Sequence, residues 1–511
     1  MPALDRSNII AVIGAGAMGA GIAQVAASAG HDVLLFDAVD GAAQRGIDNT
    51  AKGLAKLVER GRMTQQDCDA LIARINVAQS LTDVSSASLV IEAIVEQLDI
   101  KQTLFCQLED LCREDTILAS NTSSLSITAI GSTLKRPERL LGMHFFNPAP
   151  VMKLVEVISG LATDPGVAEC VFGTATRWGK LAVHARSTPG FIVNRVARPF
   201  YAEALRLLQE GAGDPSTIDA VMRDCGGFRM GPFELMDLIG HDVNYAVTSS
   251  VHSAYFGDPR FTPSLIQKEL VDAGYLGRKS GRGFYDYADN AERPAASTCD
   301  QRDGVEQITL VGNSQIAETL FELAQQAGLN IQREDDNETA IITDNATIQL
   351  TDGRMATVRA FEEDTDDLIL FDLALDFASC PRVLLSAADQ ASPQALDEAI
   401  GFFQQLGKQV SLIVDIAGMC LMRTVCMLAN EGADAVNQQV CEVEAVDIAM
   451  KAGVNYPVGP LAWADKIGLD LVLEVLDNLS QNYNEDRYRT SPLIIRKVAS
   501  GNNFYEESRY E

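Results

Sequence analysis

Two residues that could move a proton together, His144 and Glu156, stand twelve positions apart in this chain. A strand pattern precedes the histidine, and a proline-bounded turn separates it from an apolar segment that carries the glutamate. A carboxylate bonded to one ring nitrogen fixes the imidazole tautomer and leaves the other nitrogen free to take a proton from a hydroxyl. The pattern predicts a general-base pair. Spacing alone leaves a second interpretation open, a satisfied core histidine.

A glycine-rich turn, Gly14-Ala-Gly16-Ala17-Met18-Gly19, follows directly after the apolar run at 9–13. A small-residue helical segment follows, and then a second strand at 33–36 that ends at Asp37. The first glycine permits a tight turn, the second lets the backbone approach a pyrophosphate, and the third lets the helix pack on the strand. An acidic residue at the position of Asp37 accepts hydrogen bonds from ribose hydroxyls and repels a 2′-phosphate. This pattern predicts NAD rather than NADP, against the alternative of a structural turn with a solvent-facing aspartate.

The elements around these residues predict an α/β Rossmann-type domain followed by an all-α domain, then a degenerate Rossmann-like unit and a second all-α domain. Further strands are expected at 88–93, 116–119 and 140–145, so that a parallel sheet occupies about the first 185 residues. The predicted domains are an NAD-binding domain at 1–187, a helical substrate or dimerisation domain at 188–287, a linker at 288–304, a degenerate Rossmann-like domain at 305–416 and a second helical domain at 417–511.

The second half resembles a diverged copy of the first. A shift of 228 residues superposes Gly179-Lys180 on Gly407-Lys408, Gly190 on Gly418, Arg195 on Arg423, Gly231-Pro232 on Gly459-Pro460, and Asp237, Gly240 and Asp242 on Asp465, Gly468 and Asp470. The second glycine turn reads Gly312-Asn-Ser314-Gln-Ile-Ala317, and two of its three glycines are lost. We therefore predict that the second Rossmann-like unit does not bind NAD. The second helical domain is expected to pack on the first within one chain.

Composition limits the partners. A net charge of −29 argues against nucleic acid and anionic membranes, because phosphate binding needs clustered lysine and arginine. The longest apolar stretch, 410–429, is interrupted by Asp415 and Arg423, which excludes a membrane span. Ten scattered cysteines, without metal-ligand spacing, fit reduced thiols and no metal site. A strand begins almost at residue 8, so we expect no signal peptide and a cytoplasmic protein, either a monomer or a homodimer.

Seven motifs in order resemble the 3-hydroxyacyl-CoA dehydrogenase family over most of residues 8–290. They are GAGAMGAGIA, IEAIVEQLDIK, SNTSSL, GMHFFNPAPVMKLVEVI, TPGFIVNR, GGFRMGPFELMDLIGHDV and GYLGRKSGRGFYDY. The later stretches GVNYPVGPLAWADKIGLD and RYRTSPLI resemble the longer members, which include the 3-hydroxyadipyl-CoA dehydrogenases of bacterial phenylacetate degradation.

This resemblance implies NAD-dependent oxidation of an L-3-hydroxyacyl-CoA thioester, with a 3-hydroxyadipyl or 3-hydroxybutyryl group as candidate substrates. It implies His144 as the base, Glu156 as its support, Ser123 and Asn194 as hydrogen-bonding partners of the reacting oxygen, and Glu96, Lys101 and Asn121 beside the cofactor's ribose and nicotinamide. The family's basic helix for coenzyme A is represented only by Lys52 and Lys56. In the repeat, Met422 replaces Asn194, so the repeat is expected to be scaffold. Two alternatives are a dehydrogenase of a non-thioester hydroxy acid or polyol, and a non-catalytic NAD-binding scaffold.

Overall fold

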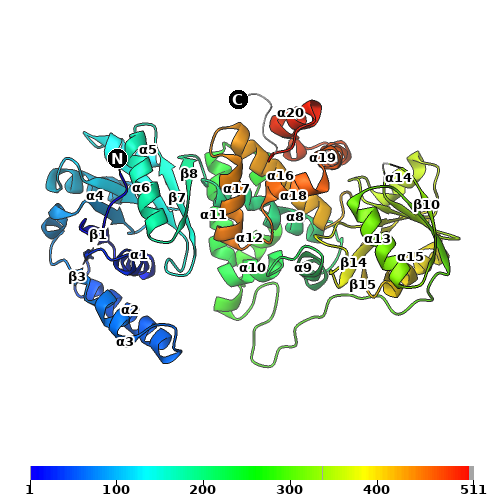
Figure 1. The fold of residues 1–511 in the computed structure, drawn as a ribbon, viewed down its shortest axis with the longest axis horizontal. Coiled ribbons are helices and arrows are strands. Elements are labelled where there is room, and N and C mark those ends of the chain that lie inside the picture. Colours follow the sequence, from blue (N-terminus) through cyan, green and yellow to red (C-terminus); the bar gives the residue numbers. More distant parts are fainter. Residues whose placement is uncertain (1, 337, 506–511) are drawn as a thin grey trace. The chain divides into compact units, whose positions relative to one another are not determined.

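The computed structural model describes residues 2–336 and 338–505, which form two compact units (Figure 1). One unit contains the chain up to Arg195 together with Gln438–Val454, and the other contains Val196–Asn437 and the chain from Asn455 onward. The domain boundaries predicted from the sequence remain predictions. One helix, α17 (Val443–Val454), departs from them: it lies in the predicted second helical domain but packs against the last two strands of the N-terminal sheet.

The first unit is built on an eight-stranded sheet with the order β3-β2-β1-β4-β5-β6-β7-β8. The central strand β1 is buried along its whole length, as expected for a strand covered on both faces by helices. The prediction of a parallel sheet holds through β6 but is wrong for β7, which pairs antiparallel with β6. The strands are β1 (Ile10–Ile13), β2 (Val33–Phe36), β3 (Ile75–Val77), β4 (Leu89–Glu92), β5 (Ile117–Ser120), β6 (Leu140–Phe145), β7 (Leu154–Ser159) and β8 (Leu181–Arg186). The helices are α1 (Ala17–Ser28), α2 (Ala42–Glu59), α3 (Gln65–Ile72), α4 (Leu98–Leu111), α5 (Ile127–Gly131) and α6 (Pro165–Arg177), with α7 (Val193–Val196) at the end of the unit and short 3₁₀ segments η1 (Leu81–Ser86) and η2 (Pro137–Arg139).

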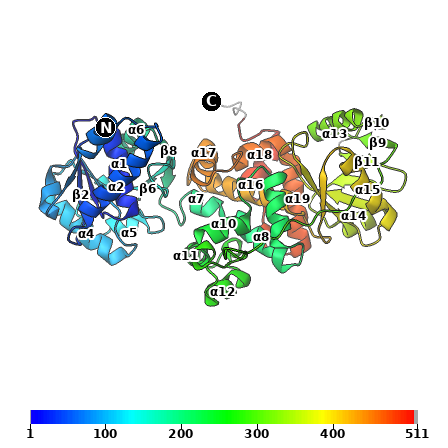
Figure 2. The same ribbon diagram turned by 90° about the horizontal axis from the view of Figure 1, so that it is seen from below.

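The second unit joins two helical groups and a second sheet. The first group is α8 (Arg198–Gln209), α9 (Pro215–Asp224), α10 (Pro232–Ile239), α11 (His241–Ala254), η3 (Pro259–Phe261), α12 (Leu265–Asp272) and η4 (Arg278–Ser280). The second is α16 (Leu421–Asn437), α18 (Pro460–Ile467), α19 (Leu469–Tyr483), η5 (Asp486–Tyr488) and α20 (Pro492–Ser500). Helix α16 packs along α8 (Figure 2), and the buried Arg423 donates to Glu203 at 2.8 Å and to the Tyr488 hydroxyl at 2.7 Å. The expected packing of the two helical regions within one chain is therefore confirmed.

The second sheet has seven strands in the order β10-β9-β11-β12-β13-β14-β15. These strands are β9 (Gln307–Val311), β10 (Asn330–Glu334), β11 (Ala340–Ile342), β12 (Thr347–Leu350), β13 (Leu368–Phe371), β14 (Arg382–Ala387) and β15 (Gln409–Leu412). Its helices are α13 (Gln315–Gln326), α14 (Ala356–Glu362) and α15 (Pro393–Gln405). Within the described residues, no helix combines the length and the apolar character needed to cross a membrane.

Matching side-chain contacts support the internal duplication. Buried Lys180 donates from Nζ to the carbonyl oxygens of Ala149 and Met152 at 2.5 and 2.8 Å. Lys408, 228 residues later, donates to the corresponding carbonyls of Phe377 and Cys380 at 2.7 and 2.8 Å. An ammonium that satisfies the carbonyls of a turn is a specific arrangement, and its recurrence at one offset in both units indicates common origin.

Candidate active site

The first unit brings His144 and Glu156 together. The two residues face each other across the antiparallel β6–β7 pair, and His144 Nδ1 lies 2.6 Å from Glu156 Oε2. The other carboxylate oxygen, Oε1, accepts the backbone N–H groups of Ile192 and Val193 at 3.0 Å each. Because an ionised carboxylate only accepts, Nδ1 carries the proton and Nε2 is the acceptor nitrogen. The Phe146 and Phe191 rings pack on the imidazole at centroid distances of 4.5 and 5.9 Å.

Ser123 and Asn194 also meet in this unit. The Asn194 side-chain amide donates to the backbone carbonyl of Ser123 at 3.3 Å. Glu96 holds the loop that carries Ser123, because its Oε1 accepts the Thr122 hydroxyl at 2.6 Å and the backbone N–H of Ser123 at 3.0 Å. Burial favours the neutral form of Glu96, but the hydrogen bond from Thr122 and the charge of Lys101 outweigh it and lower the pKa of this carboxyl. Glu96 therefore acts on the loop as a fixed anion.

Lys101 and Asn121 are part of the supporting structure. Lys101 is 1% exposed, and its Nζ lies 2.6 Å from Glu92 Oε1 and 3.2 Å from Glu96 Oε2. Asn121 Oδ1 accepts the backbone N–H of Phe145 at 2.8 Å, which ties the end of β5 to β6 beside the histidine. The sequence reasoning missed Glu92, whose full burial at the end of β4 is counterbalanced by Lys101 nine residues later.

The glycine turn between β1 and α1 meets the steric demands of a dinucleotide site. At Gly14, which has φ +99°, a Cβ would lie 2.5 Å from the Ala93 carbonyl oxygen. At Gly19 a Cβ would lie 1.7 Å from the Gly14 carbonyl oxygen, so helix and strand are in contact there. At Gly16 a Cβ would meet nothing within 4 Å. Gly16, the second glycine of the turn, therefore opens into a cavity of about 690 Å³, as the close approach of a pyrophosphate requires.

Asp37 lines the same cavity, with the start of α1 and the inner face of α2. Its Oδ2 accepts the backbone N–H of Ala15 at 2.7 Å, and its Oδ1 accepts that of Val39 at 2.9 Å. Each oxygen retains a lone pair for a ribose hydroxyl. Ala17 and Met18 form the first turn of α1, and Ala17 lines the cavity. These residues fit NAD, which accepts the hydride when bound.

Lys56 lies in the last turn of α2 and is exposed. Neither Lys56 nor Lys52 lines the cavity beside the glycine turn. Contact of Lys56 with coenzyme A therefore stays a prediction.

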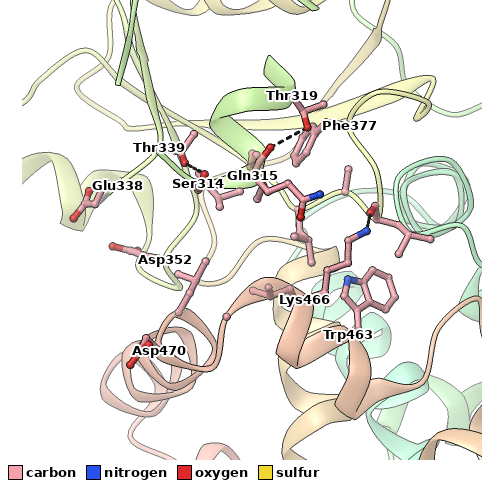
Figure 3. Close-up of a pocket in the computed structure, with 18 of the residues that line it drawn as sticks. Ser314, Gln315, Thr319, Glu338, Thr339, Asp352, Phe377, Trp463, Lys466 and Asp470 are labelled. Carbon is pink, nitrogen blue, oxygen red and sulfur yellow. Dashed lines mark hydrogen bonds between the residues drawn. The ribbon is translucent and has the colours of Figure 1, made fainter. Parts of the chain in front are cut away.

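The corresponding turn of the second unit differs in chemistry (Figure 3). Ser314 caps α13 by accepting the Ala317 N–H at 3.1 Å and shares a 2.7 Å hydrogen bond with Thr339. The turn borders a cavity of about 490 Å³ lined by five carboxylates and two cations: Glu338, Asp352, Asp376, Asp470 and Glu474, with Arg359 and Lys466. A serine cap and an acidic lining oppose a pyrophosphate. Both features support the prediction that this unit does not bind NAD.

A Rossmann sheet with this glycine turn and a buried His–Glu pair is typical of a dehydrogenase that uses NAD. Comparison with known proteins agrees. Residues 9–188 match the NAD-binding domain of 3-hydroxyacyl-CoA dehydrogenase, residues 190–287 and 418–508 match its C-terminal domain, and residues 348–416 match the reduced Rossmann-fold domain of 3-hydroxybutyryl-CoA dehydrogenase. The chain belongs to the 3-hydroxyacyl-CoA dehydrogenase family.

Its relatives include long and short members. The 3-hydroxyadipyl-CoA dehydrogenase of Escherichia coli is 44% identical over 96% of this chain and 97% of its own length. A probable 3-hydroxybutyryl-CoA dehydrogenase of Bacillus subtilis is 46% identical over 54% of this chain and 96% of its own length. The crystal structure of an Escherichia coli 3-hydroxybutyryl-CoA dehydrogenase superposes with a TM-score of 0.89 at 42% identity, covering 98% of this chain and all of that one. The chain is an NAD-dependent 3-hydroxyacyl-CoA dehydrogenase of the long form.

Proposed function

We propose that His144 is the general base for oxidation of the 3-hydroxyl group, with Glu156 as its positioning partner. The observation that carries this proposal is the 2.6 Å contact between His144 Nδ1 and Glu156 Oε2. It leaves Nε2 unprotonated and able to take the hydroxyl proton as hydride leaves C3 for NAD. Glu156 stabilises the imidazolium that forms, and the two backbone N–H groups on its other oxygen hold the carboxylate in position.

The proposal gives Ser123 and Asn194 the task of holding the reacting oxygen. The hydrogen bond from the Asn194 amide to the Ser123 carbonyl supports a shared task for the two residues, and Glu96 holds the loop of Ser123. A donor that faces the developing carbonyl favours the transition state over the ground state. Gly14, Gly16, Ala17, Met18, Gly19 and Asp37 hold NAD in this proposal, with Asn121 and Lys101 behind the nicotinamide side.

For the acyl group we propose 3-hydroxyadipyl-CoA as the preferred substrate and 3-hydroxybutyryl-CoA as the weaker one. The whole-length curated relative has the first name, and a whole-length solved structure has the second. The two substrates differ in a distal carboxylate, so a rate comparison separates them. The ten cysteines of the chain are all free thiols, which supports a cytoplasmic location.

The test is NADH consumption with acetoacetyl-CoA by the full-length protein, with NADPH as the cofactor control. We expect turnover with NADH that falls about 10²- to 10⁴-fold in His144→Gln, the usual contribution of a positioned base. The matched control is His184→Gln, because His184 also lies beside a glutamate, Glu169, at 3.2 Å but is partly exposed. NADH binding without turnover of any acyl-CoA by the wild type would contradict the proposal, and hydroxy acids and polyols would be tested next.

A further inference from the structure

A buried arginine without a counter-charge lies at the start of α8. Arg198 is 5% exposed, and its Nη1 donates to the Thr248 hydroxyl at 3.0 Å while its Cζ lies 4.8 Å from the centre of the Tyr201 ring. Its Nε has no hydrogen-bond partner. No carboxylate among the described residues forms an ion pair with this guanidinium, and burial lowers its pKa. Buried charges are normally paired, so an unpaired one indicates a missing anion.

Arg198 lines a cavity of about 340 Å³ formed within the second unit by α8, α11, η3, the start of α12 and η5. Ser264 and Arg487 also line this cavity, while the Ser264 hydroxyl and Arg487 Nε are themselves enclosed by the protein and have no hydrogen-bond partner. Apolar side chains, Leu205, Phe261 and Leu265, complete the lining. A cation without a counter-charge and apolar walls together suit a ligand with an acidic group on an aliphatic chain.

The other charges of the cavity are already engaged. Arg206 donates to both oxygens of Glu485, at 2.7 and 2.9 Å. Arg260 forms ion pairs with Glu431 and Asp434, behind the cavity. The remaining carboxylate, Glu210, accepts the Tyr483 hydroxyl at 2.7 Å. Arg487 lies 3.9 Å from Glu485 and 4.0 Å from Glu203, so Arg198 is the cation of this cavity without a carboxylate partner among the described residues.

We propose that this cavity binds a carboxylate on an aliphatic chain, and that Arg198 is its main binding residue. Nη1 donates to Thr248 and Nε is enclosed by the protein, so the ligand carboxylate pairs with the charge of the guanidinium from the side that lines the cavity. The carboxylate has two sources. One is the distal carboxylate of a dicarboxylic acyl-CoA, which rests on the proposed function. The other is a free dicarboxylate that acts as an effector.

The first arm of the test measures binding by calorimetry on the full-length protein, with adipate as the probe, adipamide as its neutral analogue and inorganic phosphate as a second anion. We expect adipate to bind, adipamide not to bind, and Arg198→Gln to weaken adipate at least 10-fold. Arg198→Lys keeps the charge but loses the planar guanidinium, so its loss of adipate affinity should be smaller than that of Arg198→Gln. The control is Arg302→Gln, because the Arg302 guanidinium pairs with Asp397 outside the cavity. This variant should bind adipate as the wild type does. Phosphate that binds as tightly as adipate would overturn the carboxylate assignment.

The second arm measures kcat/KM for 3-hydroxyadipyl-CoA and 3-hydroxyhexanoyl-CoA. If the anion is the distal carboxylate, the ratio of the two values falls about 10- to 100-fold in Arg198→Gln, the usual effect of one charge-assisted pair. If the ratio stays constant in Arg198→Gln while adipate affinity falls, the cavity binds a free dicarboxylate. If neither adipate affinity nor the ratio depends on Arg198, the proposal is wrong. Absence of acyl-CoA turnover by the wild type would instead overturn the proposed function and leave the binding arm intact.

Discussion

Replacement of Glu156 by glutamine tests how the histidine is prepared for catalysis. The Glu156 carboxylate is 0% exposed and has two separate tasks, one per oxygen. Oε2 accepts from His144 Nδ1, while Oε1 accepts from the N–H groups of Ile192 and Val193. Glutamine is nearly isosteric but has one acceptor oxygen and one donor nitrogen. With its oxygen facing the two backbone donors, its NH₂ must point at Nδ1.

An NH₂ group at that position accepts nothing from Nδ1 and donates to it instead. The imidazole then carries its proton on Nε2, the nitrogen that must receive the substrate's proton. The variant therefore keeps the fold and loses the base. We expect kcat to fall about 10²- to 10⁴-fold, the range of a lost general base, with a small change in the KM for NADH. The lost bond should destabilise the protein by about 1–3 kcal/mol.

The assay is acetoacetyl-CoA reduction followed at the NADH absorbance, with thermal melting on the same samples. Glu169→Gln is the matched control, since it removes a carboxylate from a partly exposed histidine, His184, and should leave kcat unchanged. If Glu156→Gln retains more than a tenth of wild-type kcat, the tautomer argument is refuted. An equal loss in the control would show that the effect is nonspecific.

Three further predictions follow from the same geometry. Gly16→Ala should keep the melting temperature but raise the KM for NADH about 10-fold or more, because its Cβ enters the open cavity. Gly19→Ala should destabilise the fold by about 3 kcal/mol or more, because its Cβ would lie 1.7 Å from a backbone oxygen. Thermal melting and steady-state kinetics distinguish the two variants. Lys101→Met leaves buried Glu92 without its cation and should cost about 3–5 kcal/mol in urea unfolding. Burial raises the pKa of Asp372 to about 6. Below pH 6 the folded protein keeps the Asp372 proton, which the unfolded chain releases more readily. The free energy of unfolding therefore falls as the pH rises through 6 and increases again on acidification. Denaturant unfolding at pH 7 and pH 5 checks this. The free energy of unfolding of the wild type should increase by about 1 kcal/mol more than that of Asp372→Asn when the pH is lowered from 7 to 5.

The sequence was most informative where a motif has a steric reason. The positions of Gly14, Gly16 and Gly19 predicted the β1–α1 turn, and five of the expected strand ranges coincide closely with β1, β2, β4, β5 and β6. The orientation of β7 was not predictable in the same way. A strand has the same composition whether it runs parallel or antiparallel to its neighbour. The contact between His144 and Glu156 depends on the antiparallel orientation of β7, so the sequence alone did not determine it.

Long-range contacts explain what the motifs alone did not reveal. Glu92 looked like the end of a strand, but its carboxylate also accepts the Ser120 hydroxyl at 2.7 Å and so belongs to the support of the active-site loop. Arg198 lies in a helix pattern in which an arginine is usually an exposed charge. Its burial beside Thr248 requires fifty residues of intervening chain to fold back onto α8, and no local pattern encodes that.

The repeat shows which part of the catalytic arrangement is structural. At the offset of 228 residues, Asp372 stands where His144 does and Leu384 where Glu156 does. Yet the Asp372 carboxylate accepts the N–H groups of Cys420 and Leu421 at 3.0 and 2.6 Å, the equivalents of the two donors on Glu156. The carboxylate has moved to the opposite strand of the same antiparallel pair, and its bonds to the following segment have persisted. A carboxylate at this point is therefore required to hold the chain that enters the helical region. In the first unit, the proposed base His144 is paired with an anchor that the fold already needed.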